Sequence, residues 1–337
     1  MTDRTVRLWM NHWFSAAYHI ADMIKRDDKT DFHIIGSSEN PDSVIRLMCD
    51  EWFIEPPYEN GGQYAEYCLE FCKAHGVEIF APRRGMKHIV RRRADFEAIG
   101  VSLLCDTDSE RIALLDDKSL AYEAIKSFAP EAVPPYIAVR TGGELAQAYE
   151  ALSAAHERVC MKYASDEGAV SFREIVRETR LPSLRYISDR KLTPEEAAAA
   201  VDAGSGKPLL IMPYLTGTEV SADCLRTPRG NIILPRFKLG GRAAEVRPDT
   251  ELTTLCERFL TEIPLFSPCN IQFRYHDGKP YFLEVNTRMS GGIQLSCLSA
   301  GVNLPNIAVN QLINIDKEWT VSPHPRRVAH VEMPVLL

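Results

Sequence analysis

The sequence has no apolar run long enough to span a membrane, and its first residues lack the pattern of a secretory signal peptide. Its nine cysteines are scattered and form no Cys-x-x-Cys pair. We therefore expect the cysteines to act as small apolar residues in a reducing compartment, and we expect no zinc site. The net charge of −7 argues against a broad nucleic-acid-binding surface. We therefore expect a cytoplasmic protein that acts without nucleic acid and without a membrane.

Glycine is missing where a dinucleotide-binding fold needs it. Short apolar segments alternate with helical patterns over the first hundred residues, which predicts a parallel α/β sheet. The first predicted strand, residues 6–10, is followed by Asn-His-Trp-Phe-Ser, without the glycines that let a pyrophosphate approach the backbone. This absence argues against a nicotinamide-dependent dehydrogenase.

The most informative segment that is present is 281–292, which reads YFLEVNTRMSGG. A β-strand sends alternate side chains to the same face, so Glu284 and Asn286 point the same way, and Arg288 follows at the strand's end. Two glycines then allow the backbone to turn tightly. Oxygen ligands beside a guanidinium suit a magnesium-bound phosphate, so the segment predicts that the protein handles a nucleoside triphosphate.

The preceding segment, residues 269–275, alternates apolar and polar residues and predicts the first strand of a β-hairpin. A three-residue loop at 276–278 would pair residue 275 with 279 and place Gln272, Glu284 and Asn286 on one face. A two-residue Asp277-Gly278 turn would put Gln272 and Glu284 on opposite faces. The cleaner separation of polar and apolar residues favours the three-residue loop. Taken alone, such a hairpin is also compatible with a merely solvated polar face.

Four further features precede the hairpin. Asp117-Lys118 opens a helix, Lys162 ends a strand before a small-residue loop, a buried strand carries Met-Pro-Tyr-Leu at 212–215, and Gly217-x-Glu219 follows. In this order, with the hairpin, they resemble the ATP-grasp superfamily from about residue 109 to 314. The stretch 212–223 is most similar to ATP-grasp proteins associated with tellurite-resistance-type gene clusters. A glutamine at the position of Gln272 resembles carbamoyl-phosphate synthetase large chains, whereas many relatives have glutamate there.

The resemblance implies an α/β fold with two successive parts. An N-terminal Rossmann-like pre-ATP-grasp domain would span 1–108, and a two-lobed α+β ATP-grasp domain would span 109–314. A small lid lobe is expected at about 130–211, and residues 315–337 form a C-terminal tail that covers the sheet or reaches a partner.

The resemblance also implies ATP and Mg²⁺ (or Mn²⁺) as cofactors. Lys118 and Lys162 would reach the phosphates, the loop 165–171 would close over them, the backbone of 212–215 would read adenine, and Glu219 would take the ribose hydroxyls. The implied ATP-binding residues are Lys118, Lys162, Ser165, Gly168, Met212, Pro213, Tyr214, Leu215 and Glu219. The implied metal ligands are Gln272, Glu284 and Asn286. The implied catalytic residues are Arg288, Lys238 and Arg242. For Lys238 and Arg242, a purely structural role is an equally open alternative.

The function implied is that of an ATP-dependent carboxylate–amine or carboxylate–thiol ligase. A carboxylate would attack the γ-phosphate to give an acyl-phosphate and ADP, and an amine or related nucleophile would displace phosphate. Two alternatives stay open: an ATP-binding regulator with reduced catalysis, to which the neutral Gln272 and the single lid glycine Gly168 point, and a kinase that stops at phosphoryl transfer. The partners expected are a small-molecule carboxylate and an amine, and a homodimer through the first domain stays open.

Overall fold

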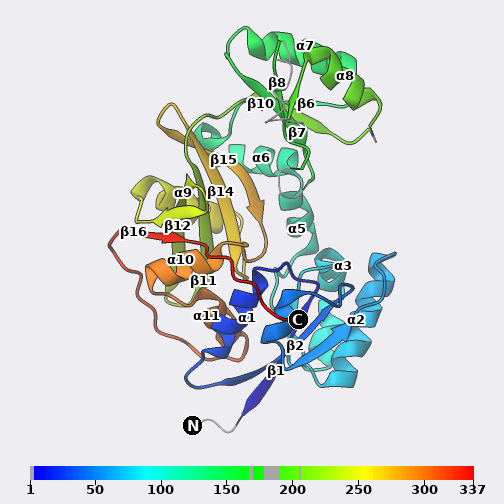
Figure 1. The fold of residues 1–337 in the computed structure, drawn as a ribbon, viewed down its shortest axis with the longest axis vertical. Helices are drawn as coiled ribbons and strands as arrows, with labels where there is room; N and C mark the ends of the chain where they lie inside the picture. The colour runs from blue at the N-terminus through cyan, green and yellow to red at the C-terminus, as the bar shows by residue number, and fades with distance from the viewer. Residues whose placement is uncertain (1–3, 167–169, 178–189, 205) are drawn as a thin grey trace. The chain divides into compact units, whose positions relative to one another are not determined.

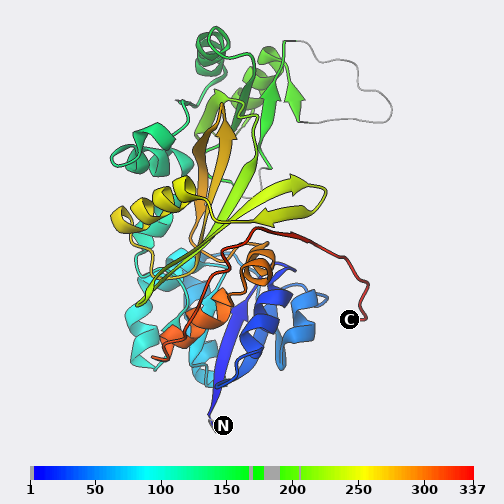
Figure 2. The ribbon, with the colours of Figure 1, turned by 90° about the vertical axis from the view of Figure 1, so that its left-hand side faces the viewer.

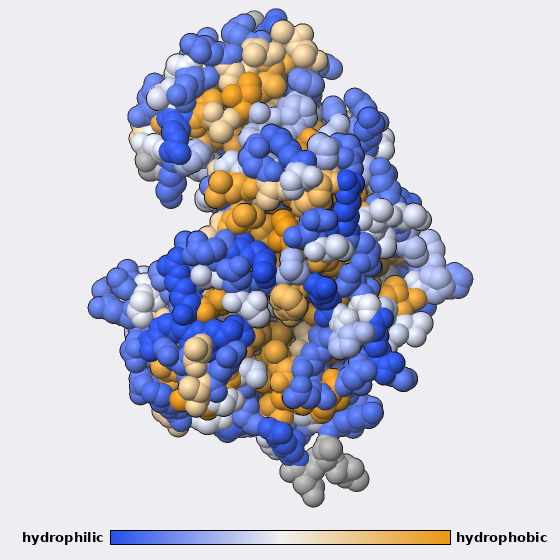
Figure 3. Space-filling view, turned by 180° about the vertical axis from the view of Figure 1, so that it is seen from behind, coloured by the Kyte–Doolittle hydropathy of each residue, from blue (hydrophilic) through white to orange (hydrophobic). Residues whose placement is uncertain are grey.

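The computed structural model describes residues 4–166, 170–177, 190–204 and 206–337. The chain forms two compact units. The N-terminal unit comprises residues 1–113, 219–272 and 285–337, and the inserted unit comprises residues 114–218 and 273–284. In the face shown in Figure 3, hydrophobic residues gather in separate patches among hydrophilic ones. No helix in the described ranges is long and apolar enough to cross a membrane.

The N-terminal unit begins with a five-stranded parallel sheet of order β3-β2-β1-β4-β5 (Figure 1). Its strands are β1 (Thr5–Asn11), β2 (Asp31–Ser38), β3 (Glu51–Ile54), β4 (Ile79–Pro82) and β5 (Ser102–Leu103). The intervening helices are α1 (Ala17–Lys25), η1 (Val44–Met48), α2 (Gly61–His75), α3 (Met86–Arg91) and α4 (Arg93–Ala98). Leu8 and Met10 pack with α1 on one face, and Trp9 packs with α2 on the other, as the period of two requires. The predicted parallel α/β sheet is confirmed.

A second sheet has the order β15-β14-β11-β12-β13-β16 (Figure 2). Its strands are β11 (Glu219–Thr227), β12 (Gly230–Gly240), β13 (Ala243–Val246), β14 (Cys269–His276), β15 (Lys279–Asn286) and β16 (Arg326–Ala329). The accompanying helices are α9 (Thr250–Glu262), α10 (Ile293–Ala300) and α11 (Leu304–Leu312), whereas Ile112 of α5 (Ser109–Asp116) packs in the core of the first sheet. The C-terminal segment adds β16 to β13 at the edge of this sheet, and Lys317 Nζ lies 2.9 Å from the Asp27 carboxylate. The tail therefore covers its own unit.

The inserted unit is built on a sheet of order β6-β10-β7-β8-β9. Its strands are β6 (Ile137–Val139), β7 (Val159–Tyr163), β8 (Arg173–Ile175), β9 (Lys191–Leu192) and β10 (Leu209–Pro213). Its helices are α6 (Lys118–Lys126), η2 (Pro130–Ala132), α7 (Gly142–Ser153) and α8 (Pro194–Asp202). Both α7 and α8 begin with a complete capping box, at Thr141 and Thr193, which satisfies backbone donors in the first turn.

The β14–β15 hairpin corrects one prediction. Asp277 and Gly278 form a two-residue turn and both have left-handed backbones, with φ of 49° and 77°, so the predicted three-residue loop is wrong. The rings of Phe273 and Phe282 lie 4.6 Å apart, as expected when residue 276 pairs with 279. Strict alternation does not continue, because Phe282 and Val285 are both buried although they are three residues apart. The burial pattern thus changes phase at Leu283–Glu284.

The predicted metal ligands lie on these two strands. Ile271 and Val285 are buried, whereas Gln272, Glu284 and Asn286 are all partly exposed. With the two-residue turn, regular alternation would put Gln272 and Glu284 on opposite faces of the hairpin, so the shared face predicted from the longer loop does not follow.

Candidate functional site

Two lysines of the inserted unit lie with their amines beside strand β15. Lys118 is the first residue of α6, whose N-cap Asp117 accepts hydrogen bonds from the backbone N–H groups of the first turn. Lys162 lies in β7, between β8 and β10. Both side chains are largely withdrawn from solvent, with 4% and 9% of their residue surface exposed. A lysine is seldom buried to this extent unless its charge is balanced or used.

The ammonium group of Lys118 is balanced by carboxylates. Its Nζ lies 2.9 Å from the Asp166 carbonyl oxygen, 3.1 Å from Asp166 Oδ1 and 3.5 Å from Glu284 Oε2. Burial acts to raise the pKa of Asp166, but hydrogen bonds from Ser171 and the charge of Lys118 outweigh it and lower this pKa from its ordinary value. Lys118 therefore lies near two carboxylates, those of Asp166 and Glu284, and Glu284 is the residue of β15 that the sequence predicts as a metal ligand.

The amine of Lys162 is directed to the backbone of the same strand. Its Nζ lies 3.3 Å from the Leu283 carbonyl oxygen and 3.5 Å from the Tyr122 hydroxyl. The Tyr122 hydroxyl donates to the same carbonyl at 2.8 Å. Burial raises the pKa of Tyr122, so this hydroxyl stays protonated and remains a donor. The Leu283 carbonyl lies where the burial pattern of β15 changes phase, and it accepts from both side chains.

The remaining predicted nucleotide contacts of the inserted unit lie near the end of β10. Met212, Pro213 and Leu215 are buried, and Tyr214 is partly buried. The Tyr214 N–H donates to the Arg158 carbonyl at 2.9 Å, and the Arg158 guanidinium lies 3.8 Å from the centre of the Tyr214 ring. This places a cation and an aromatic ring beside the backbone predicted to read adenine.

The predicted lid is only partly described. Ser165 Oγ donates to Asp117 Oδ2 at 3.3 Å, which ties the start of the loop to the N-terminus of α6. Gly168 lies outside the described residues.

In the N-terminal unit, Arg288 lies just beyond the end of β15. Its guanidinium is 5.5 Å from the centre of the Phe14 ring, and its Nη1 donates to the Met289 carbonyl at 3.2 Å. Phe14 belongs to the connection between β1 and α1. The loop that carries Arg288 is therefore packed on the end of the first sheet.

The two other predicted catalytic cations have different partners. Lys238 forms an ion pair with Glu219 between neighbouring strands β12 and β11. Arg242 has a left-handed backbone, with φ of 74°, and its Nη1 lies 2.7 Å from Glu332 of the C-terminal segment. The structure brings Lys238 to the residue predicted to bind ribose, whereas Arg242 is paired with the tail.

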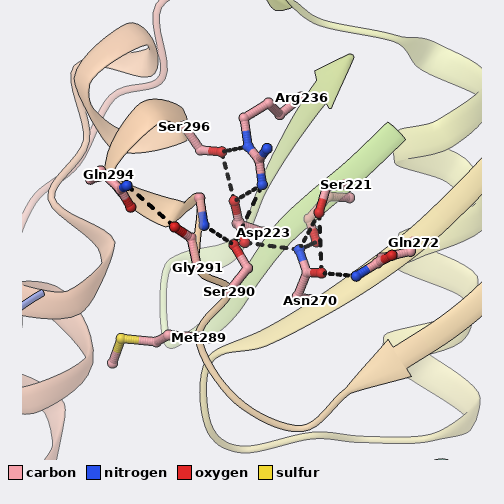
Figure 4. A network of polar contacts seen from close by, with 12 residues as sticks. Ser221, Asp223, Arg236, Asn270, Gln272, Met289, Ser290, Gly291, Gln294 and Ser296 are labelled. Atoms are coloured by element: carbon pink, nitrogen blue, oxygen red, sulfur yellow. Dashed lines mark hydrogen bonds and ion pairs between the residues drawn. The ribbon is translucent and has the colours of Figure 1, made fainter. Parts of the chain in front are cut away.

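A buried network beneath the Arg288 loop was missed by sequence reasoning (Figure 4). Asp223 is 0% exposed. Its Oδ2 accepts from Ser296 Oγ at 2.6 Å and lies 3.8 Å from Nη2 of Arg236, which is 6% exposed. Arg236 Nε donates to Ser296 Oγ at 3.1 Å, and its Nη2 lies 3.5 Å from Ser290 Oγ. A signal existed in the immediate neighbours, because Asp223 lies between Ala222 and Cys224 and Arg236 lies between Pro235 and Phe237.

The network continues along β14 to a predicted metal ligand. Asn270 is 0% exposed and donates from Nδ2 to Asp223 Oδ1 at 2.9 Å. Gln272 donates from Nε2 to Asn270 Oδ1 at 3.2 Å. Polar contacts therefore run without a break from Gln272 to the segment that follows Arg288.

The predicted metal ligands comprise one carboxylate and two amides. Within residues 4–166, 170–177, 190–204 and 206–337, no three His, Cys, Asp or Glu side chains are grouped as metal ligands. The predicted ligands would give a hard cation a mixed set of oxygens, in which Gln272 and Asn286 would supply neutral ligands and Glu284 the charge.

Comparison with known proteins agrees with this architecture. Residues 205–334 match the model of a family described as ATP-grasp in the biosynthetic pathway with Ter operon. No curated protein matches the chain. Many solved structures resemble it, among them the biotin carboxylase domain of Hydrogenobacter thermophilus 2-oxoglutarate carboxylase, a dimer in complex with MgADP, ADP and bicarbonate. That structure is 16% identical with a TM-score of 0.66, over 94% of this chain and 71% of the other.

Two further structures show the same likeness. Biotin carboxylase of Campylobacter jejuni, in a β,γ-ATP complex, is 14% identical with a TM-score of 0.69, over 93% of this chain and 72% of the other. N5-carboxyaminoimidazole synthetase of Staphylococcus aureus, complexed with ADP, is 12% identical with a TM-score of 0.69, over 96% of this chain and 81% of the other. At these identities the likeness shows the fold, and it covers nearly the whole chain. The α/β fold predicted from the sequence is confirmed, and the family match over residues 205–334 agrees with the predicted resemblance to ATP-grasp proteins.

Proposed function

We propose that this ATP-grasp protein is an ATP-dependent ligase that joins a small-molecule carboxylate to an amine or a related nucleophile. The observation that carries the proposal is the meeting of Lys118, Lys162 and Glu284 within the inserted unit. Two nearly buried ammonium groups are directed at one strand, one to its backbone carbonyl and one to its carboxylate. Phosphoryl transfer needs positioned positive charge in this way, because it depends mainly on orientation and charge neutralisation.

The residues present fit a nucleoside triphosphate. Lys118 is held by Asp166 and Glu284, so its charge is already balanced, and a phosphate that displaces one carboxylate leaves that balance intact. Lys162 Nζ lies beside the Tyr122 hydroxyl and the Leu283 carbonyl, and in this proposal it contacts a second phosphate. In this proposal the backbone of residues 212–215 reads adenine and Glu219, paired with Lys238, takes the ribose hydroxyls.

The residues also fit a divalent cation. Gln272, Glu284 and Asn286 would hold Mg²⁺ or Mn²⁺ through oxygen, and all three side chains are partly exposed on β14 and β15. The bound cation would neutralise charge on the transferring phosphates.

The chemistry proposed has two steps. A carboxylate oxygen of the substrate attacks the γ-phosphorus, the bond from that phosphorus to the β-phosphate oxygen breaks, and ADP leaves. The amine nitrogen then attacks the acyl carbon, loses a proton, and inorganic phosphate leaves. Arg288 stabilises the acyl-phosphate by charge, and Lys238 and Arg242 are the further candidates for contact with an anionic group. The similar structures support this class of reaction, because they include biotin carboxylases and N5-carboxyaminoimidazole synthetases with bound ADP or ATP analogues.

The test is ADP release from ATP and Mg²⁺ in the presence of pooled carboxylates and amines. Glu284→Ala should abolish release, whereas Glu251→Ala, an exposed residue in the first turn of α9, should not change it. ADP release by Glu284→Ala at the wild-type rate would contradict the metal assignment. Tight ATP binding by the wild type with no ADP release would favour a regulator, and a stable phosphorylated product without an amide would favour a kinase.

A further inference from the structure

We propose that Asn270 is a positioning residue that fixes the amide of Gln272 with its oxygen, and not its NH₂ group, available to a divalent cation. The inference rests on the proposed function, in which Gln272 is a metal ligand. An amide can turn either end toward a cation, but only the oxygen binds one. A neutral glutamine at a metal site therefore needs a neighbour that selects its orientation.

The orientation of the Asn270 amide is set first by Asp223, which is buried on β11. Its Oδ2 accepts from Ser296 and its Oδ1 lies 2.9 Å from Asn270 Nδ2. The Ala222 carbonyl oxygen lies 3.3 Å from the same nitrogen. A carbonyl and a carboxylate paired with Arg236 offer no hydrogen, so the NH₂ group of Asn270 must face them. The opposite orientation would press the amide oxygen against two acceptors in a buried site, where such contacts are costly.

The orientation passes from Asn270 to Gln272. With its NH₂ group turned to Asp223, Asn270 presents Oδ1 to Gln272, whose Nε2 lies at 3.2 Å. A reversed Gln272 would bring two amide oxygens together at this distance. The NH₂ group of Gln272 is thereby committed to Asn270, and its Oε1 is directed away from Asn270. Figure 4 shows the line of contacts from Arg236 and Asp223 through Asn270 to Gln272.

Ser221 provides a matched control within the same network. Its Oγ lies 2.9 Å from Asn270 Nδ2 and 3.1 Å from Asn270 Oδ1. A hydroxyl both donates and accepts, so Ser221 satisfies either orientation of the amide and selects neither.

The experiment measures the affinity for Mn²⁺ by electron paramagnetic resonance, with saturating β,γ-methylene-ATP, in a double-mutant cycle. Gln272→Ala should weaken Mn²⁺ binding. Asn270→Ala should weaken it about three- to tenfold, the range of one hydrogen bond, and should cause no further loss when Gln272 is already alanine. Ser221→Ala should bind Mn²⁺ as the wild type does. Circular dichroism melts check that each variant is folded.

The outcomes separate this inference from the proposed function. If Asn270→Ala weakens Mn²⁺ binding equally in the wild-type and Gln272→Ala backgrounds, Asn270 acts through general structure and the inference is overturned, while the proposed function stands. If Gln272→Ala binds Mn²⁺ as tightly as the wild type, the ligand assignment and the inference both fail. Should Asn270→Ala not fold, Asn270→Ser replaces it, with the same expected loss, because serine is too short to present an acceptor to Gln272 Nε2.

Discussion

Adjacent glycines after Arg288 should respond very differently to the addition of one methyl group. A Cβ at Gly292 would lie 2.5 Å, 2.6 Å and 2.8 Å from three atoms of the Arg236 guanidinium. A Cβ at Gly291 would have Phe14 as its nearest neighbour, at 3.7 Å, which is ordinary contact. Gly292 has φ of −114°, which alanine adopts without strain, so only the contact with Arg236 opposes the substitution.

The magnitude follows from how Arg236 is held. To restore ordinary contact of about 3.4 Å, the guanidinium must move by roughly 0.9 Å. Arg236 is 6% exposed and bonded to Ser296 beside the buried Asp223, so it has no open space to enter. Overpacking costs about 1–3 kcal/mol, and weakening a charged hydrogen bond adds to this. We expect Gly292→Ala to lower the free energy of unfolding by about 2–4 kcal/mol, and Gly291→Ala by less than about 0.5 kcal/mol.

The assay is urea unfolding of the wild type and both variants, followed by far-ultraviolet circular dichroism. The midpoint of Gly292→Ala should fall clearly below the other two, without a change of slope. ADP release should fall in parallel, because the loop that carries Arg288 is displaced. Equal midpoints for the two alanine variants would refute the reasoning, since they would show that Arg236 moves aside freely and that the network does not fix this loop.

Two further predictions concern charged groups. Lys118→Met should raise the KM for ATP about tenfold or more, the value of a charged hydrogen bond, whereas the exposed Lys126→Met in the same helix should not; steady-state ADP release measures both. Burial raises the pKa of Asp27, but bonds from Lys317, Asn310 and two backbone N–H groups outweigh it and lower this pKa from 3.8 to about 2. The ionised Asp27 carboxylate therefore stabilises the fold above about pH 4, and this contribution is lost as the pH falls toward 2. Asp27→Asn should be less stable than the wild type at pH 7, and the difference between their urea midpoints should narrow below pH 4.

Most of the fold could be predicted from local patterns in the sequence. The helix starts at Asp117, Thr141 and Thr193 were predictable because a cap and the helix that it begins are neighbours in sequence. The parallel sheet was predictable because alternating strands and helices leave few other arrangements. The order of Lys118, Lys162 and the β15 residues was enough to indicate the family, although no single motif was.

The register of the hairpin was not predictable by the same means. Counting alternate residues assumes a regular strand, and under that assumption only a three-residue loop grouped Gln272 with Glu284. The structure has the two-residue turn, with Asp277 and Gly278 left-handed, and a change of phase further along β15. The turn depends on the left-handed backbones of Asp277 and Gly278, and the polar pattern of the flanking strands does not report them.

The glycines after Arg288 show how a tertiary contact changes the meaning of a motif. The sequence suggests that they allow a tight turn, but neither has the positive φ for which glycine is needed. At Gly292 what matters is the missing side chain, because the guanidinium of Arg236 occupies that space. Arg236 is held there by its pairing with the buried Asp223, because a buried carboxylate without a partner would strongly destabilise the fold. The members of this network come from β11, β12, β14 and the start of α10, so no window of sequence contains it, and the residue that sets the shape of the Arg288 loop lies more than fifty positions away from it in the chain.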